Sequence, residues 1–291
     1  MNSPKTISVS FYVGITTTLQ YHSALDKTAD LLLSAKALIL ASYAMKPDVS
    51  IVVPAFDEQD RLGASLSKIL EYVSRERLAA ELIVVDDGSS DGTADVARAA
   101  ALDFSEIKTT VIRYEQNRGK GFAVRTGLLA AAADIALFSD ADLSTPIDEL
   151  PKLVDPIRAG DFDVTFGSRA IDRSLIGNHQ PWRREQGGKV MNLVIKTMSG
   201  LRFHDTQCGF KAFNMVRFRP LLEVMTIDRF GFDVEFLFVA QAHGLRLAEI
   251  PVRWNDVAGS KVSVFRDTRR MFKELNQIRQ NAKRGFYDKF S

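Results

Sequence analysis

The chain has 291 residues, of which 46% are hydrophobic and 25% charged, and its formal net charge is only +2. This is the composition of an ordinary globular protein with enough chain for a full core, and so balanced a charge does not by itself indicate nucleic-acid binding. The single cysteine, Cys208, excludes a disulfide framework and a cysteine metal cluster, and the four histidines lack metal-ligand spacing. A reducing, cytoplasmic setting fits these counts.

The first 47 residues differ from the rest. Residues 31–44 are apolar apart from four positions, but this run is too short and too interrupted for a membrane-spanning helix, which needs about 20 apolar residues. A signal peptide is not indicated, because the charged n-region is weak and no strong cleavage site follows. We expect residues 1–47 to be a poorly ordered or loosely helical extension, with a loosely membrane-associated helix as the alternative.

From Val49 onward, apolar runs of strand length alternate with segments of helical spacing. The expected strands are residues 49–53, 81–85, 110–114 and 135–138, and the expected helices are residues 58–77, 91–101, 121–132 and 147–159. Pro54 is expected to end the first strand. Alternation at this interval predicts an α/β fold with a mostly parallel central sheet that is flanked by helices on both faces.

The second half is less regular. Its expected strands are residues 164–166, 210–213 and 248–254, its expected helices are residues 189–198 and 233–243, and a polar, basic loop runs to about Arg184. We expect one sheet-centred domain over residues 48–262.

Residues 263–291 are expected to form a basic amphipathic helix. Met271, Phe272, Leu275 and Ile278 fall on one helical stripe. Such a helix either lies in an anionic membrane interface or packs its stripe on the sheet domain. No aromatic stacking platform accompanies the positive charge, so we expect no nucleic-acid partner.

Two aspartates, Asp140 and Asp142, directly follow the apolar run at residues 134–138. A strand that ends in this way carries both carboxylates to the carboxyl edge of the sheet, where ligands of open α/β folds bind. Two adjacent hard oxygen ligands suit Mg²⁺ or Mn²⁺, which are commonly shared with substrate phosphates. The sequence therefore predicts a Mg²⁺ or Mn²⁺ cofactor at this edge.

Further acidic and glycine-rich segments, at residues 54–58, 86–93 and 117–121, follow the first strands. Acidic side chains at a strand end can accept hydrogen bonds from a ribose or a base, and glycines allow close approach of the backbone. Residues 119–121 do not complete a Walker pattern, and no Gly-x-Gly-x-x-Gly follows the first strand. An NTPase and a dinucleotide-dependent dehydrogenase are therefore disfavoured.

The motifs IVVPAFDE (51–58), VDDGSSDGT (85–93), NRGKG (117–121) and DAD (140–142) resemble, in order and spacing, those of the family 2 glycosyltransferases of GT-A fold. The resemblance covers residues 50–261. It implies that Asp140 and Asp142 hold the metal ion on the diphosphate of a nucleotide sugar. The implied nucleotide-binding residues are Pro54, Ala55, Asp57, Glu58, Asp86, Asp87 and Lys120. The family usually has Asn where this chain has Asp57.

The motifs FGSR (166–169), DTQCGFK (205–211), FDVE (232–235), PVRW (251–254) and GSK (259–261) look like those of the dolichyl-phosphate β-glucosyltransferases. The related polyprenyl-phosphate mannosyltransferases tend to carry an Arg in the interval where this chain has residues 255–258. The resemblance therefore implies UDP-glucose rather than GDP-mannose as donor, and Lys261 belongs to a loop that resembles one closing over the diphosphate.

The implied acceptor is a polyprenyl phosphate, whose second pKa near 6 leaves the attacking oxygen largely anionic at neutral pH. Such a reaction needs cations more than a general base. Arg169, with Arg183 or Arg184, is a candidate for the acceptor phosphate, because guanidinium binds phosphate bidentately. Asp205 or Asp233 is expected to orient the sugar or assist the acceptor, and Gln207 to contact substrate.

We therefore expect an inverting, metal-dependent hexosyltransferase that moves glucose from UDP-glucose to a polyprenyl (dolichyl-type) phosphate, peripheral on the cytoplasmic face of a membrane. Its expected catalytic residues are Asp140, Asp142, Arg169, Asp205 and Asp233. The alternatives are a GDP-mannose-dependent mannosyltransferase, a transferase with a sugar hydroxyl acceptor, and a catalytically silent nucleotide-sugar binding module.

Overall fold

The computed structural model describes residues 5–10, 16–21, 46–177, 182–257 and 264–288. The chain divides into two compact units, Met1–Lys46 and Pro47–Ser291. In the first unit, β1 (Lys5–Ser10) pairs with β2 (Thr16–Tyr21) in an antiparallel arrangement. The apolar run at residues 31–44, and the helix considered for it, lie outside the described residues. Among the helices of the described part, none combines the length and apolarity needed to cross a membrane.

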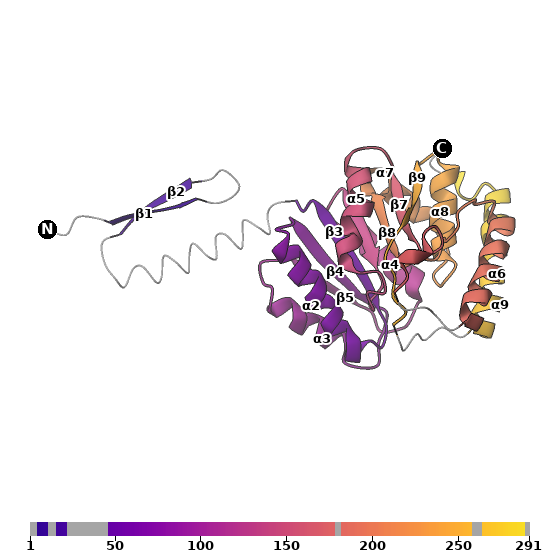
Figure 1. Ribbon diagram of the computed structural model, residues 1–291, viewed down its shortest axis with the longest axis horizontal. Coiled ribbons are helices and arrows are strands. Elements are labelled where there is room, and N and C mark those ends of the chain that lie inside the picture. Colours follow the sequence, from indigo (N-terminus) through magenta and orange to yellow (C-terminus); the bar gives the residue numbers. More distant parts are fainter. Residues whose placement is uncertain (1–4, 11–15, 22–45, 178–181, 258–263, 289–291) are drawn as a thin grey trace. The chain divides into compact units, whose positions relative to one another are not determined.

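A seven-stranded sheet forms the centre of the second unit (Figure 1), in the order β5-β4-β3-β6-β8-β7-β9. Its strands are β3 (Val49–Ala55), β4 (Ala80–Asp86), β5 (Thr109–Arg113), β6 (Ile135–Ser139), β7 (Val164–Ser168), β8 (Phe210–Asn214) and β9 (Leu247–Pro251). Only β8 runs antiparallel to its neighbours, β6 and β7; every other pairing in this sheet is parallel. The predicted α/β class with a mostly parallel sheet is confirmed.

Helices bury both faces of the sheet. One core contains side chains of α2 (Gln59–Arg75), α3 (Thr93–Leu102) and α5 (Leu150–Arg158), and the other contains side chains of α4 (Lys120–Ala130), α6 (Trp182–Ser199), α8 (Phe232–Ala242) and α9 (Val264–Lys283). Alternate residues of β3 serve the two cores, since Ile51 and Val53 lie in the first and Val52 in the second. Burial on both faces explains why the strands read as continuous apolar runs.

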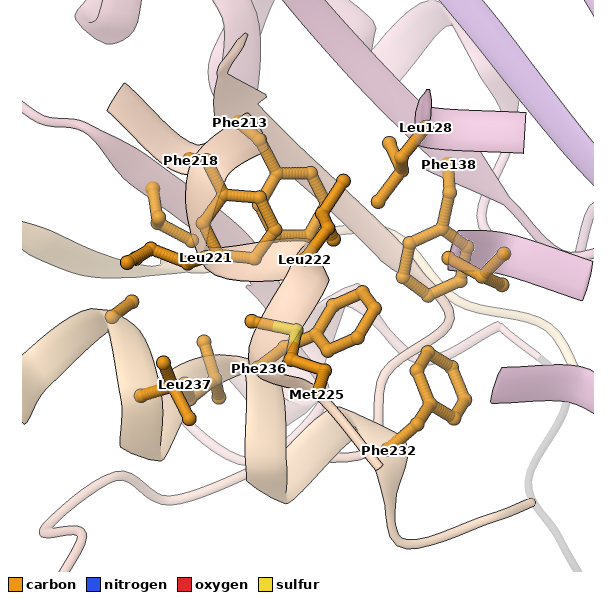
Figure 2. Close-up of a cluster of buried hydrophobic side chains, with 14 of the residues drawn as sticks. Leu128, Phe138, Phe213, Phe218, Leu221, Leu222, Met225, Phe232, Phe236 and Leu237 are labelled. Atoms are coloured by element: carbon orange, nitrogen blue, oxygen red, sulfur yellow. The ribbon is translucent and has the colours of Figure 1, made fainter. Parts of the chain in front are cut away.

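The second core anchors the chain between β8 and α8 (Figure 2). Here α7 (Met215–Phe218) continues into the 3₁₀ helix η3 (Arg219–Val224). The ring of Phe213 stacks on that of Phe218 with centroids 4.3 Å apart, and Phe232, at the start of α8, packs on Phe138 of β6 with centroids 5.8 Å apart. These aromatic contacts hold the start of α8 against the sheet, next to the segment at residues 225–231.

The apolar stripe of α9 is part of this same core. Met271, Leu275 and Ile278 are buried, whereas Phe272 is exposed. The apolar stripe of this helix therefore packs on the sheet domain, which is the second of the two arrangements expected from the sequence.

Several boundaries differ from the expected ones. Pro54 lies within β3, whose pairing with β4 continues to Ala55. The helix expected from residue 147 begins as a 3₁₀ turn, η1 (Ile147–Glu149), and the last strand ends at Pro251, beyond which Trp254 forms an isolated bridge with Ile176. That bridge follows a second 3₁₀ turn, η2 (Arg173–Leu175).

Pro54 is tolerated because β3 has a partner on only one side at that point. Pairing between β3 and β6 stops at Val52 and Phe138, whereas pairing between β3 and β4 continues. A missing N–H in a stretch without a second partner strand breaks no ladder bond. After β5 the chain crosses through α4 to β6, which lies on the opposite side of β3 from β4 and β5. The boundary between β3 and β6 is therefore a topological switch point, where open α/β sheets bind ligands.

Candidate active site

A cleft of about 360 Å³ lies at the carboxyl ends of β3 and β6. Both strands at the switch point contribute to it: β3 supplies Pro54 and Ala55, and the loop after β6 supplies Asp140 and Asp142. The other lining residues are Phe56, Glu58, Arg61, Asp87, Asn117, Gly119, Lys120, Ala123, Ala141, Arg229, Phe230 and Arg270. The structure thus brings together residues from motifs that are almost 90 positions apart in the sequence.

Lys120 and Asp140 form an ion pair inside this cleft, with Nζ 2.6 Å from Oδ1. Burial by itself would lower the pKa of Lys120, but the carboxylates of Asp140 and Asp233 outweigh it and the pKa is raised. The lysine is therefore a permanent cation at neutral pH. Room for the Asp140 carboxylate comes from Gly209, because a Cβ atom there would lie 2.0 Å from Oδ2.

The donor set at Asp140 and Asp142 fits a divalent cation. Among the described residues, the buried Asp140 Oδ1 has no hydrogen bond beyond its ion pair with Lys120, and Asp142 Oδ1 accepts a hydrogen bond from the Ser144 N–H at 3.0 Å. Two carboxylates supply part of the coordination of Mg²⁺ or Mn²⁺, whose remaining ligands are usually waters and substrate phosphates. No third acidic, histidine or cysteine ligand joins them within the described ranges.

Asp87 lines the cleft but its carboxylate is already engaged. It accepts hydrogen bonds from the backbone N–H groups of Arg118 and Gly119, both at 2.8 Å, and from Asn117 Nδ2 at 2.9 Å. Burial raises the pKa of Asp87, while these backbone donors oppose the rise. The side chain therefore shapes the loop that leads to Lys120 as well as one wall of the cleft.

Asp86 and Asp57 do not line the cleft. The buried Asp86 accepts a hydrogen bond from Ser89 N at 2.9 Å, and Asp57 accepts one from Ser90 N at 2.8 Å. Both side chains thereby fix the loop at residues 86–93. Glu58, which does line the cleft, is paired with Arg61, whose Nη2 donates to Oε1 at 2.6 Å.

Asp233 forms a buried ion pair with Lys211 next to the cleft. Lys211 is 0% exposed, and its Nζ donates to Asp233 Oδ1 and to the Cys208 carbonyl, both at 2.6 Å. Burial raises the pKa of Asp233, although Lys211 and Lys120 oppose the rise. Asp233 therefore links the core beneath the sheet edge to the charges at Lys120 and Asp140.

Arg169 and Asp205 form a bidentate ion pair, with distances of 2.6 Å from Nε to Oδ2 and 2.9 Å from Nη2 to Oδ1. Burial would raise the pKa of Asp205, but Arg169 outweighs it and the pKa is lowered. The Asp205 N–H donates to Glu249 Oε1 at 2.6 Å, and the Gln207 N–H donates to Asp205 Oδ1 at 3.2 Å. Arg169, the arginine predicted to bind a phosphate, is thus held at the edge of the sheet by the carboxylate of Asp205.

Three further predicted residues have no described side-chain position. Arg183 and Arg184 belong to the first turn of α6, which begins at Trp182, and not to a loop as expected. A helix could begin there because the segment lacks proline after residue 181. Lys261 lies outside the described residues.

Sequence reasoning missed Arg229, Phe230 and Arg270. The first two precede the FDVE motif, and Arg270 lies within α9, more than 100 positions after Asp140. No local motif marks them. The one available signal was the helical periodicity of α9, in which Arg270 directly precedes the buried Met271.

The family model described as "Glycosyl transferase family 2" matches residues 50–224. Among curated relatives, the dolichyl-phosphate beta-glucosyltransferase of Homo sapiens is 32% identical over 243 residues, which are 79% of this chain and 74% of the relative. The protein of the same name from Saccharomyces cerevisiae is 30% identical over 264 residues, covering 82% of this chain and 76% of the relative.

The structure also resembles solved structures. Glucosyl-3-phosphoglycerate synthase from Mycobacterium tuberculosis, solved with Mn²⁺, UDP-glucose and phosphoglyceric acid, matches with a TM-score of 0.59 at 21% identity over 82% of each chain. At this identity the likeness shows the fold alone, and it agrees with the expected GT-A arrangement.

Proposed function

The chain belongs to glycosyl transferase family 2, and on that premise we propose that it transfers glucose from UDP-glucose to a polyprenyl phosphate with inversion at the anomeric carbon. The observation that carries this proposal is the convergence of Asp140, Asp142 and Lys120 with Pro54 and Ala55 in one cleft at the switch point of the sheet. Acidic metal ligands and a permanent cation at one ligand edge suit a nucleotide diphosphate.

The identity of donor and acceptor rests on the relatives. Curated proteins about one third identical to this chain are named dolichyl-phosphate beta-glucosyltransferases. The interval at residues 255–258 also lacks the arginine expected of the mannosyl branch. UDP-glucose and a dolichyl-type phosphate are therefore favoured over GDP-mannose and over a sugar hydroxyl acceptor.

In the proposed reaction, a phosphate oxygen of the acceptor attacks the anomeric carbon as the bond from that carbon to UDP breaks. The electron pair of the broken bond leaves on UDP. An acceptor phosphate with a second pKa near 6 attacks as a dianion at neutral pH, so no proton has to be removed. The chain then has to supply position and positive charge, and not a strong general base.

Lys120 meets part of that need, because its ammonium faces the carboxylates at which the diphosphate would bind. Asp140 and Asp142 would hold Mg²⁺ or Mn²⁺, and such an ion would neutralise negative charge on the departing diphosphate. Asp233 and Lys211 fix the neighbouring charges in place through their buried pair. Arg169 is proposed to act on the acceptor side, with its orientation set by Asp205.

A membrane-facing surface is proposed where α6 and α9 lie side by side. Val190 and Leu193 on α6 and Phe272 on α9 are exposed apolar side chains. Among the described side chains of α9 and of the residues that follow it, the exposed basic ones are Arg269, Lys273, Arg279, Lys283 and Arg284. Exposed apolar groups near several cations suit an anionic lipid surface, to which each nearby cation contributes about 1 kcal/mol.

Transfer of radiolabel tests the proposal. The protein is incubated with Mn²⁺, labelled UDP-glucose and a short polyprenyl phosphate, and label is expected in the organic phase. EDTA is expected to abolish transfer and added Mn²⁺ to restore it. Asp142→Ala is expected to lose transfer while its thermal unfolding stays cooperative, and an active Asp142→Ala variant would contradict the metal role.

Parallel reactions separate the alternatives. GDP-mannose replaces the donor in one, and an unphosphorylated polyprenol or a soluble sugar replaces the acceptor in others. Label that moves only from GDP-mannose would make the donor assignment wrong, and transfer to a hydroxyl acceptor would make the acceptor assignment wrong.

A further inference from the structure

Two arginines in the cleft have no role in the proposed transfer step. Arg229 lies in the segment at residues 225–231, between η3 and α8, and Arg270 lies in the second turn of α9. Both line the same cleft as Asp140 and Asp142, although they come from the far end of the chain. A cation that lines a ligand cleft needs an anionic partner, either from the protein or from the ligand.

Neither arginine has a protein partner of this kind in the described part of the chain. Among the described side chains, no carboxylate lies within 4.0 Å of either guanidinium, whereas Arg61 and Lys120, the other cleft cations, are paired with Glu58 and Asp140. Glu274 is close enough for both arginines to lower its pKa, but burial dominates and the pKa of Glu274 is raised. The positive charge of this pair therefore remains directed at the cleft.

The segment that carries Arg229 is held rigidly on its α4 side. Arg125 donates to the Met225 carbonyl at 2.9 Å and to Asp228 Oδ1 at 2.6 Å, and the Phe122 N–H donates to the Asp228 carbonyl at 3.0 Å. A Cβ atom at Gly119 would lie 2.7 Å from Arg229 Cγ. Arg229 thus rests directly on the glycine that precedes Lys120.

The same segment is also held by α8 and by the C-terminal end of the chain. Glu235 accepts hydrogen bonds from Thr226 N at 2.9 Å, from Ile227 N at 2.8 Å and from Tyr287 Oη at 2.8 Å. In α9, Glu274 accepts one from Gly231 N at 2.8 Å. Because α9 carries both Glu274 and Arg270, the position of Arg270 is tied to the position of Arg229.

We infer that Arg229 and Arg270 form an anion subsite for phosphate oxygens, and that α9 thereby completes the donor cleft. The inference rests on the proposed function, since the ligand is the diphosphate of the nucleotide sugar. Arginine binds phosphate oxygens through paired N–H donors, and a rigid segment holds those donors in place before the ligand binds. The charge of Arg229 also acts on Asp87, at the nucleotide end of the cleft, which favours the donor diphosphate over the acceptor phosphate.

Calorimetric titration of UDP in the presence of Mn²⁺ tests this subsite. Arg270→Ala and Arg229→Ala are expected to raise the Kd for UDP by about 10- to 100-fold, the effect of losing a hydrogen bond to a charged group. The Kd for uridine, which has no phosphate, is expected to stay the same. Arg270→Lys is expected to lie in between, because it keeps the charge but loses the paired donors.

Arg269→Ala is the matched control, because it removes the same charge from the neighbouring position of α9, where the side chain is exposed. It is expected to leave the Kd for UDP within about twofold of wild type, since exposed charges at a distance are screened by salt. Thermal unfolding of each variant shows that α9 is still packed. Equal UDP affinity in Arg270→Ala and Arg269→Ala would overturn the inference.

Two further outcomes are distinguishable. If wild-type protein binds no UDP at all, the proposed donor is wrong and this subsite falls with it. If wild type binds UDP, Arg270→Ala keeps that affinity and its KM for polyprenyl phosphate rises instead, then the donor assignment of the subsite is wrong while the proposed function stands.

Discussion

Lys120 Nζ lies 2.6 Å from Asp140 Oδ1, so the chain itself places a cation on the first carboxylate of the Asp-x-Asp pair. The pKa of Lys120 is raised by Asp140 and Asp233 in spite of its burial. A divalent ion at Asp140 would therefore meet a neighbouring positive charge. The same charge would favour binding of the diphosphate. Lys120 would therefore weaken binding of the metal ion alone and strengthen binding of the ion together with the nucleotide.

Lys120→Met is expected to bind Mn²⁺ about tenfold more tightly than wild type when nucleotide is absent, because a like charge a few ångströms away has been removed. Transfer from UDP-glucose is expected to fall, since the diphosphate loses a cation. Electron paramagnetic resonance of free Mn²⁺ measures the affinity. Lys68→Met, at an exposed position of α2, is the control, and unchanged Mn²⁺ affinity in Lys120→Met would contradict the competition.

Gly209→Ala is expected to reduce transfer by about 100-fold or more, because displacement of Asp140, a proposed metal ligand, by about an ångström would be costly. A Cβ atom at this position would lie 2.0 Å from Asp140 Oδ2 and 2.2 Å from Asp140 Cγ. The atoms that must move belong to the end of a side chain, so we expect the fold to survive while the carboxylate is displaced.

The control for this change is Gly188→Ala in α6, where an added Cβ meets nothing within 4 Å. It is expected to leave transfer unchanged and to stabilise the helix by about 0.5–1 kcal/mol. Initial rates and urea unfolding curves of both variants decide the matter. A Gly209→Ala variant with wild-type rates would show that Asp140 need not stay where the structure has it.

The sequence could predict the sheet and its ligand edge because both signals are local. Residues 49–53 and 81–85 are apolar throughout, apart from Ser50 and Glu81, so both faces of each strand are apolar. Each run is followed by acidic residues. Ser50 and Glu81 are buried together through a hydrogen bond of 2.7 Å, and Lys108 pairs with the glutamate. Even these exceptions do not disturb the strand pattern.

The sequence could not predict which acidic side chains form hydrogen bonds within the loops and which face the cleft. Asp57, Asp86 and Asp87 have the same side chain and lie at the ends of two paired strands, β3 and β4. Only Asp87 of these three lines the cleft, and its oxygens are engaged by the loop at residues 117–119. Their roles depend on which backbone N–H groups approach them from elements far along the chain. For the same reason Arg229 and Arg270 were missed, because no local motif places α9 over the cleft.

Replacing Lys211 alone is expected to destabilise the protein more than replacing both partners of its buried pair. Lys211→Met leaves the Asp233 carboxylate buried beside an apolar side chain, and breaking such a pair costs about 3–5 kcal/mol. The double variant Lys211→Met with Asp233→Leu removes both charges and is expected to recover at least half of that loss. Urea unfolding of the two variants measures the difference, and equal stabilities would mean that the two charges are not coupled.

Asp205→Asn is expected to be less stable than wild type at pH 7, by about 1–3 kcal/mol, because the paired guanidinium of Arg169 loses its carboxylate. The pKa of Asp205 in the folded protein is lowered from 3.8, so its ionised form contributes stability above about pH 4. That contribution is lost as the pH falls through the folded pKa. The difference in unfolding free energy between wild type and Asp205→Asn should therefore shrink progressively below pH 4.

Urea unfolding at pH 7, 4 and 3 measures this difference directly. Other buried carboxylates with lowered pKa, including Asp163 and Glu149, make both proteins lose stability in acid, so only the difference between the two curves reports on Asp205. Asp161→Asn, which changes an exposed carboxylate, is expected to follow wild type at every pH. A gap that stays constant down to pH 3 would mean that the ionised Asp205 does not stabilise the fold through Arg169.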